Sequence, residues 1–508
     1  MRFLRLTTLA ILAAATAIDA AETARHEPFE SGAALKSHGP IDDLVLRELA
    51  RRGIEPASPC SDGVFLRRAY LDVIGTLPTA AEARAFLADA GEGKRAALVE
   101  RLLERPERAD YWAMKWSDRL RVKSEFPINL WPNAVQAYHR WIRTAMAENR
   151  PYDRFARELL TASGSNFRVP PVNFYRALPR RDPAAIAQAV ALTFMGTRTE
   201  RWPDERLAGM AAFFAQVAYK PTAEWKEEIV FFDPGRPAGS AAVFPDGRPA
   251  MLTPGRDPRE AFADWLIAAD NPWFARAAAN RIWSWLFGRG LVDEPDDMRP
   301  DNPPVHPEVL AYLERELIAT GYDLRHLYRL ILTSQVYQLS PLLRREPPDA
   351  AALFARYAVR PIEAEVLVDA LDRATGTSEE YESRIPEPFG YAPAGQRAVA
   401  LADGSVTSAF LETFGRPPRD TGRESERSLR PTAGQRLQLL NSSRVQSKLA
   451  ALGSLPLDDL YLTLLARFPT DGERSAARAY LSRAANRRDA TVDVAWALVN
   501  GVEFLHRH

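Results

Sequence analysis

The sequence predicts a mainly α-helical protein with two helical domains joined by a short β-hairpin or extended linker. Apolar residues recur at helical spacing along most of the chain, and proline, glycine and capping residues mark the helix ends. One run, Ile229-Val-Phe-Phe232, is instead typical of a β-strand. A chain of 508 residues is too long for one ordinary core, so we expect two or three domains.

The first helical domain is predicted over residues 38–220. Its helices are indicated by three apolar faces: Ile41, Leu44, Val45 and Leu49 before Gly53; Leu98, Val99, Leu102 and Leu103 before Pro106; and Val135, Tyr138, Trp141, Ile142 and Ala145 between Pro132 and Pro151. Proline in the first turn and glycine after the last turn are the expected helix boundaries.

Residues 221–255 are predicted to form the β or extended linker, because Pro234-Gly235 and Asp246-Gly247 are turn signals beside the β-type run.

The second helical domain is predicted over residues 256–508. Its first helix has Asp257 as cap, Pro258 in the first turn and Glu260 three residues on; Asp323 begins another helix. Val492, Trp496 and Val499 mark the last element, and residues 378–430 form a loop-rich excursion.

One pattern occurs twice. Pro78-Thr-Ala-Ala-Glu82 and Pro469-Thr-Asp-Gly-Glu473 each follow a Tyr-Leu pair at the same spacing. A duplicated binding unit would explain the repeat, but two helix corners of the same construction are favoured. Threonine as cap with glutamate three residues later accounts for the shared residues.

The start of the chain is typical of a secretory signal peptide over residues 1–20. Arg2 and Arg5 precede an apolar stretch from Leu6 to Ala17, which is too short for a permanent membrane anchor. We therefore expect an exported protein, periplasmic or extracellular, with no transmembrane span. The 66 basic and 66 acidic residues balance, which argues against a nucleic-acid partner.

Most signatures of catalysis or redox chemistry are missing from the sequence. There is one cysteine, Cys60, and there is no Cys-x-x-Cys-His, so a covalent c-type haem is excluded. The serine-hydrolase elbow, the zinc-protease motif and the nucleotide-binding glycine loops are also absent.

The acidic loop after the two glycines Gly288 and Gly290 is the best remaining candidate for chemistry. Asp296, Asp297 and Asp301 could hold Ca²⁺ or Mg²⁺, and Asp297 with His306 could form an acid–base pair. The alternative is structural and is favoured: aspartates suit turns, and Pro307-Glu308 fits the first turn of the next helix.

Candidate binding residues lie in and around the same block: Asn280, Arg281, Trp283, Asn302, Arg360 and Glu365. The tryptophans at 131, 141, 265, 273, 283 and 285 suggest stacking on sugars, although burial in the core is favoured. Glu365 and Asp369 share a helix face, and Arg360 or an arginine of the other domain could join them. A structural ion-pair network is the favoured interpretation.

Long motifs mark a resemblance to two bacterial domain families of unknown function. Phe65-Leu-Arg-Arg-Ala-Tyr-Leu-Asp-Val-Ile-Gly-Thr-Leu-Pro78 and Asn149-Arg-Pro-Tyr-Asp-Arg-Phe155 resemble family 1549. Residues 257–266, Asn271-Pro-Trp-Phe274, the block from Asn280 to Glu308, Leu330–Tyr337 and Leu439-Leu-Asn441 resemble family 1553. The resemblance implies an exported protein, of a kind often fused to cytochrome c or sugar-binding modules.

The chain departs from these families at their cysteines. Many relatives carry Cys-x-x-Cys-His where this sequence reads Gly196-Thr-Arg-Thr-Glu-Arg-Trp-Pro203, and cysteines where it reads Thr421-Gly-Arg-Glu-Ser-Glu426. We therefore expect a protein that binds a partner protein or an envelope polymer such as a polysaccharide. The alternatives are a cation-assisted hydrolase or lyase on a polysaccharide-like polymer and an electron-transfer scaffold without its own haem.

Overall fold

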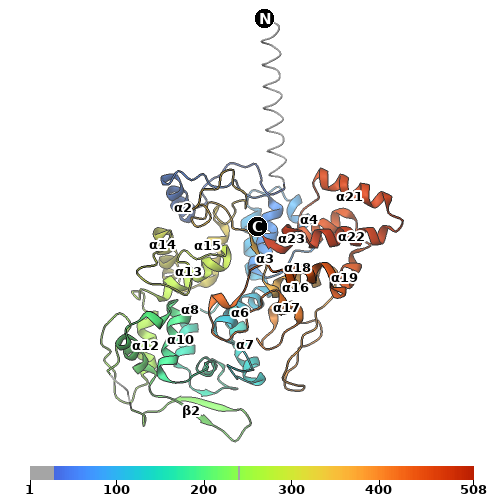
Figure 1. The fold of residues 1–508 in the computed structure, drawn as a ribbon. Helices are drawn as coiled ribbons and strands as arrows, with labels where there is room; N and C mark the ends of the chain where they lie inside the picture. The colour runs from blue at the N-terminus through green and yellow to red at the C-terminus, as the bar shows by residue number, and fades with distance from the viewer. Residues whose placement is uncertain (1–27, 238–240) are drawn as a thin grey trace.

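The computed structural model describes residues 28–237 and 241–508. The signal peptide predicted over residues 1–20 lies outside this part of the chain. The prediction of a mainly α protein is confirmed, because helices dominate and the sheets are small (Figure 1). No helix within the described ranges is long and apolar enough to cross a membrane.

The helices of the first half follow one another with short connections. They are α2 (Pro40–Arg51), α3 (Asp62–Val73), α4 (Ala80–Ala88), α5 (Lys94–Glu104), α6 (Glu107–Arg119), α7 (Pro132–Ala147), α8 (Tyr152–Thr161), α9 (Asn173–Arg176), α10 (Pro183–Met195) and α11 (Asp204–Ala211). Short 3-10 turns separate some of them: η1 (Pro170–Val172), η2 (Thr199–Arg201) and η3 (Ala212–Phe214).

The second half has more irregular structure between its helices. Its helices are α12 (Pro258–Ile267), α13 (Phe274–Phe287), α14 (Pro307–Ala319), α15 (Leu324–Thr333), α16 (Ala364–Thr375), α17 (Ala409–Thr413), α18 (Ala433–Asn441), α19 (Ser443–Leu449), α20 (Leu457–Leu465), α21 (Asp471–Arg483), α22 (Arg487–Val499) and α23 (Val502–Leu505). The 3-10 turns are η4 (Ala398–Ala400), η5 (Glu424–Glu426) and η6 (Ala450–Leu452). Residues 378–430 contain only α17, η4 and η5, so the predicted loop-rich excursion is confirmed.

Two small antiparallel sheets accompany the helices. In the first, β3 (Glu228–Phe232) lies between β1 (Gly164–Ser165) and β2 (Val217–Pro221), with Tyr219 opposite Val230. The predicted hairpin is present, although it begins at Val217 rather than after residue 220. In the second sheet, β4 (Arg360–Pro361) pairs with β5 (His506–Arg507). The prediction that α22 is the last element is wrong, because α23 and β5 follow it.

Most predicted helix ends are formed as the capping chemistry requires. Both copies of the repeated pattern are capping boxes, Thr79 with Glu82 and Thr470 with Glu473. Asp323 accepts a hydrogen bond from the backbone N–H of His326. Asp257 caps α12, but Glu260 pairs with Arg256 instead of closing a capping box. These local contacts explain why the helices begin where the sequence predicts.

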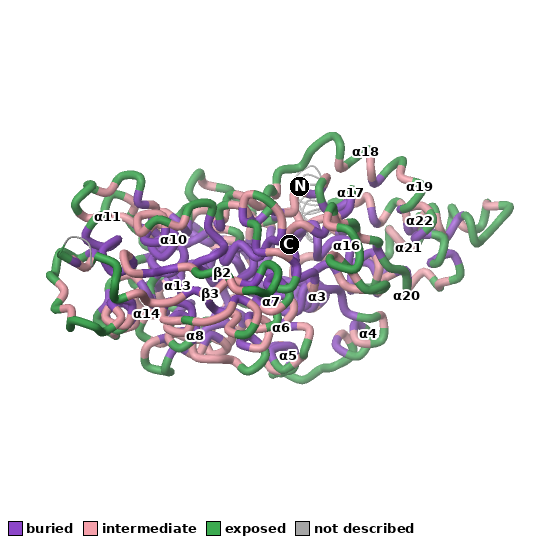
Figure 2. The backbone as a smooth tube through the Cα atoms, turned by 90° about the horizontal axis from the view of Figure 1, so that it is seen from below, coloured by how far each residue is buried: buried purple, intermediate pink, exposed green. Residues whose placement is uncertain are grey.

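The two halves of the chain share one core. Buried apolar side chains from Ile41 to Phe504 form a continuous cluster, and the buried backbone runs through the middle of the molecule in Figure 2. Helix α12 packs on α8, α15 on α5 and α20 on α4. In Figure 1, α3 and α6 lie between α13–α15 on one side and α16–α22 on the other. The division into two domains stays a prediction from the sequence.

Candidate functional site

The block that links α13 to α14 is held by buried contacts to its own helix. Helix α13 ends at Gly288, whose φ of 80° is the left-handed conformation that glycine adopts readily. Asn280 is fully buried; its side chain accepts from the backbone N–H of Val292 at 2.8 Å and donates to the carbonyl of Val292 at 2.9 Å. Asn302 donates to the carbonyls of Asp293 and Asp297. Both predicted binding asparagines therefore shape the loop.

The aspartates predicted as metal ligands are paired with arginines. Asp296 is buried between Arg119 at 3.0 Å and Arg281 at 3.4 Å, while Asp297 and Asp301 both pair with Arg299 at 2.9 Å. Within residues 28–237 and 241–508, no group of three histidine, cysteine, aspartate or glutamate side chains is arranged to hold a metal ion. The arginines already neutralise these carboxylates, so the arrangement does not favour a cation here.

The proposed acid–base pair is also not formed. His306 is buried, and its Nε2 lies 3.1 Å from the carbonyl oxygen of Leu353, while Asp297 contacts Arg299. Burial lowers the pKa of His306, so the ring stays neutral. His306 is the residue that precedes α14, which begins at Pro307 as predicted. The geometry therefore favours the structural interpretation of this loop.

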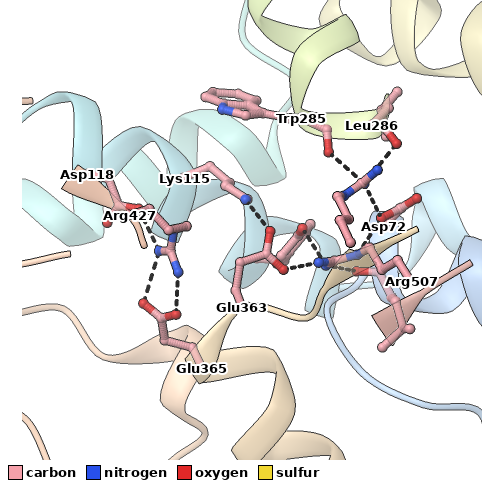
Figure 3. A network of polar contacts seen from close by, with 12 residues as sticks. Asp72, Lys115, Asp118, Trp285, Leu286, Glu363, Glu365, Arg427 and Arg507 are labelled. Carbon is pink, nitrogen blue, oxygen red and sulfur yellow. Dashed lines mark hydrogen bonds and ion pairs between the residues drawn. The ribbon is translucent and has the colours of Figure 1, made fainter. Parts of the chain in front are cut away.

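A network of buried charges lies beside the loop and joins the C-terminal strand to helices of both halves of the chain (Figure 3). Arg507 of β5 forms ion pairs with Asp72 of α3, at 2.7 Å, and with Glu363, which precedes α16. Lys115 of α6 contacts the other oxygen of Glu363 at 2.6 Å. Arg360 donates to the carbonyl of Leu286 at 2.8 Å and pairs with Asp72 at 3.3 Å. The predicted residue Arg360 thus joins α13 to the centre of the molecule.

A second set of buried charges attaches the excursion to the same centre. Arg427 binds both oxygens of Glu365, at 2.6 and 3.0 Å, and also contacts Asp118 at 2.7 Å (Figure 3). Arg419 pairs with Asp118 at 2.9 Å. The sequence predicted an arginine partner for Glu365, and the structure identifies Arg427, together with Arg416 at 3.5 Å, rather than Arg360.

A cavity of about 210 Å³ opens between this network and the loop, lined by Lys115, Trp285, Arg289, Glu294, Arg360 and Glu424 among others. Burial opposes the charge of Glu363, but Arg507 and Lys115 outweigh it and hold its pKa well below the usual value. The Glu363 carboxylate is therefore permanently ionised and paired near neutral pH. Such a group stabilises structure but is a poor proton donor or acceptor.

The remaining predicted side chains of α13 are structural as well. Arg281 is buried and donates to the carbonyls of Thr193 and Leu192 of α10. Trp283 is fully buried, with its ring centroid 4.3 Å from that of Phe287 and 5.2 Å from that of Phe354. The favoured interpretation of Trp283 as a core residue is consistent with this placement.

Three aromatic side chains from distant segments meet instead on the surface. We call Trp131, Trp225 and Phe389 the aromatic cluster. The ring centroid of Trp225 lies 4.7 Å from that of Trp131 and 5.4 Å from that of Phe389. Trp225 is 59% exposed and Phe389 is 45% exposed. Lys226 lies over both indole rings, 5.1 Å from the Trp131 centroid. Large apolar rings that remain exposed side by side make this surface a candidate for interaction.

The backbone that presents the cluster is strained. Trp131, immediately before α7, has a φ of 70°, and Lys226 in the β2–β3 turn has a φ of 64°. Bulky residues rarely adopt positive φ, and such strain persists where the surrounding structure imposes it, often at ligand sites. Two residues of this surface thus have positive φ.

A groove of about 500 Å³ extends from the cluster between α7 and the excursion. Asn133, Gln136 and Arg140 line it from one exposed face of α7. Phe389, Tyr391 and Gln396 line it from the excursion, and Tyr391 is 63% exposed. The sequence named Trp131 among its stacking candidates but not Trp225, Phe389 or Tyr391. The sequence signal that could have identified them is the presence of large aromatic residues in turn-rich segments.

His139 is a buried residue of α7 beside the groove. Its side chain is buried, and its Nε2 has no hydrogen-bond partner among the described residues. Burial, with Arg419 and Arg143 nearby, lowers its pKa to about 3. The imidazole is therefore uncharged near neutral pH.

Asp369 of α16 fixes the wall of the groove. Its two carboxylate oxygens accept hydrogen bonds from the backbone N–H groups of Ala398, at 2.6 Å, and Val399, at 3.2 Å. Burial raises the pKa of Asp369 to about 7, although Arg397 and the two N–H groups oppose this shift. The folded protein therefore holds a proton on Asp369 at pH values where the unfolded chain has lost it.

This shift makes stability depend on pH in a specific direction. The stabilising contribution is complete below the unfolded pKa of about 3.9 and is lost as the pH rises through about 7. Asp369→Asn keeps the side chain neutral throughout. From pH 4 to pH 8 its free energy of unfolding should rise relative to wild type by up to about 4 kcal/mol, since one pKa unit is worth about 1.4 kcal/mol. Urea unfolding of both proteins at pH 4, 6 and 8 measures this, and a constant difference would contradict it.

The two segments where related sequences are expected to carry cysteines also come together. Arg423 of the excursion forms an ion pair with Glu200, and both residues line one cavity with Thr197 and Thr421. No thiol is present in either segment of this chain. The single cysteine, Cys60, is buried elsewhere, where it precedes α3.

Comparison with known families agrees with the resemblance seen in the sequence. Residues 40–217 match the family model described as "PSCyt2: Protein of unknown function (DUF1549)". Residues 258–481 match the model described as "PSD1: Protein of unknown function (DUF1553)". No curated protein and no solved structure matches the chain. The chain therefore carries a DUF1549 segment followed by a DUF1553 segment.

Proposed function

We propose that the protein binds a polysaccharide outside the cytoplasm, with the aromatic cluster and the adjoining groove as its binding site. The observation that carries this proposal is the convergence of Trp131, Trp225 and Phe389 on the surface, from three segments far apart in the sequence. Export is proposed from the signal-peptide pattern of residues 1–20.

The chemistry of the surface suits a sugar polymer. Flat aromatic faces can pack against the apolar C–H faces of sugar rings, and Trp225 and Phe389 each expose about half of their side chain beside Lys226. The groove adds the amides of Asn133, Gln136 and Gln396 and the guanidinium of Arg140 for sugar hydroxyls. Ligand-binding sites usually combine aromatic and apolar walls with a few polar groups.

The arrangement also suits a chain rather than a single sugar. Phe389 belongs to both the aromatic cluster and the groove, so the two parts form one continuous surface. Successive sugar units could contact the cluster and the groove together. Binding to several weak subsites at once raises the overall affinity for a polymer.

A hydrolase or lyase is supported less well. Asp297 and His306 have separate structural partners, and the ionised groups around the smaller cavity are already paired. The binding proposal needs no bond cleavage, and it uses the surface that the fold leaves exposed.

Binding to a panel of soluble plant and bacterial polysaccharides tests the proposal by affinity electrophoresis. We expect retardation by at least one neutral polymer and at least tenfold weaker binding by Trp225→Ala, because a central aromatic contact is typically worth about 2 kcal/mol or more. The melting temperature should stay within about 2 °C, since Trp225 is largely exposed.

Tyr480→Ala is the matched control. Tyr480 is 49% exposed on α21, outside the cluster and the groove, so this variant should bind as wild type does. Equal binding by wild type and Trp225→Ala would contradict the proposed site. Absence of binding to every polymer in the panel would count against polysaccharide recognition itself.

A further inference from the structure

A separate cavity of about 390 Å³ lies between the α9–α10 region and the Asp420–Arg423 turn of the excursion. One wall is apolar and consists of Leu178, Pro179, Ala185, Ala189 and Leu192. The opposite lining is charged and holds four arginines, at 121, 180, 198 and 423, but only two carboxylates, Glu200 and Asp420. Arg180, Arg198 and Arg423 form ion pairs with Asp182, Glu294 and Glu200, so Arg121 is the one arginine of this lining without an ion pair in the part of the chain that the structure describes.

Arg121 is the unusual member of this lining. It is 1% exposed and donates to the carbonyls of Ala177, at 2.8 Å, and Thr421, at 3.3 Å. Its Nη2 is shielded from solvent and has no hydrogen-bond partner among the described residues. Burial lowers its pKa to about 10, because the favourable charge of the nearby Glu426 does not offset the removal of the cation from water.

The nearest acidic groups already have partners. Glu426 accepts hydrogen bonds from the backbone N–H groups of Asp420, Thr421 and Gly422, at 2.9 to 3.0 Å. Asp420 pairs with Lys123 at 2.6 Å, and Glu200 pairs with Arg423. A buried charge without a partner is costly, so an anion that enters the cavity gains favourable electrostatic energy.

We propose that this cavity binds a small carboxylate with an apolar body. The carboxylate lies toward Arg121, and the apolar body lies against Ala185, Ala189 and Leu192 of α10. The unpaired buried charge of Arg121 favours an anionic ligand over a neutral one. A volume of about 390 Å³ is within the usual range for small-molecule sites.

Octanoate and octanol separate the two parts of this proposal, because they share an apolar chain and differ in charge. Isothermal titration calorimetry of the full chain should show octanoate binding at least ten times more tightly than octanol. Ala185→Trp, which fills the cavity from a partly exposed position on α10, should weaken octanoate binding at least tenfold. Ala97→Trp, on an exposed face of α5, is the matched control and should bind as wild type does.

Arg121→Met tests the charge itself, with circular dichroism as the check that the variant folds. Its preference for octanoate over octanol should fall to less than threefold. No octanoate binding by wild type, equal affinity for octanol, or unchanged binding by Ala185→Trp would each overturn the proposal. If Arg121→Met does not fold, the alcohol comparison and the Ala185→Trp variant still decide the matter. The site shares no lining residue with the groove, so either proposal can fail alone.

Discussion

Arg507→Met is expected to lower the free energy of unfolding by about 3–5 kcal/mol, because it leaves buried carboxylates without their cation. Arg507 is fully buried and pairs with both Asp72 and Glu363. It also donates to the carbonyl of Leu71 and lies 3.2 Å from the Tyr111 hydroxyl. Its removal therefore affects α3, α6 and α16 together.

Arg47→Met is the matched control for this prediction. Arg47 also links the two halves of the chain, through Glu308 at 2.9 Å, but the two side chains are 64% and 72% exposed. Water and salt screen an exposed pair, so the variant should be indistinguishable from wild type in guanidinium unfolding. A similar loss of unfolding free energy in both variants would contradict the claim that burial of the network determines its contribution to stability.

Trp283→Ala is expected to cost about 3–5 kcal/mol, as for other large aromatic side chains removed from a core. The Trp283 side chain is fully buried against Phe287 and Phe354. Trp283→Phe should lose less, because it keeps part of the packing. Urea unfolding measures the loss, and polysaccharide binding by the folded fraction should be unchanged.

The contrast with Trp225→Ala makes this prediction sharper. Trp225 is exposed, so its removal should weaken binding with little effect on stability, whereas removal of Trp283 should do the reverse. A Trp283→Ala protein that kept wild-type stability but lost polysaccharide binding would instead indicate that the binding site lies at α13.

Helix positions could be predicted because their signals are local. Thr79 with Glu82, Asp323 and Pro307 determine helix starts through contacts within a few residues. The C-terminal strand was not predicted. His506–Arg507 is too short to show a period, and its pairing with Arg360–Pro361 depends on the tertiary fold.

The candidate site was harder to predict, because its contacts join distant segments. The carboxylates of the acidic loop predicted a cation site, but the arginines that neutralise Asp296 come from α6 and α13, which are distant in the sequence or on the preceding helix. Trp131 was a candidate from the sequence alone. Its neighbours Trp225 and Phe389 lie in a hairpin turn and in the excursion, and sequence spacing does not reveal that these segments meet.

The most direct test of the account is the affinity of the double variant Trp225→Ala/Phe389→Ala for a polysaccharide that binds the wild-type protein. We expect a loss of at least a hundredfold at unchanged thermal stability, because two exposed rings of one surface are removed. Binding within threefold of wild type would contradict the claim that the aromatic cluster and the groove form the binding site.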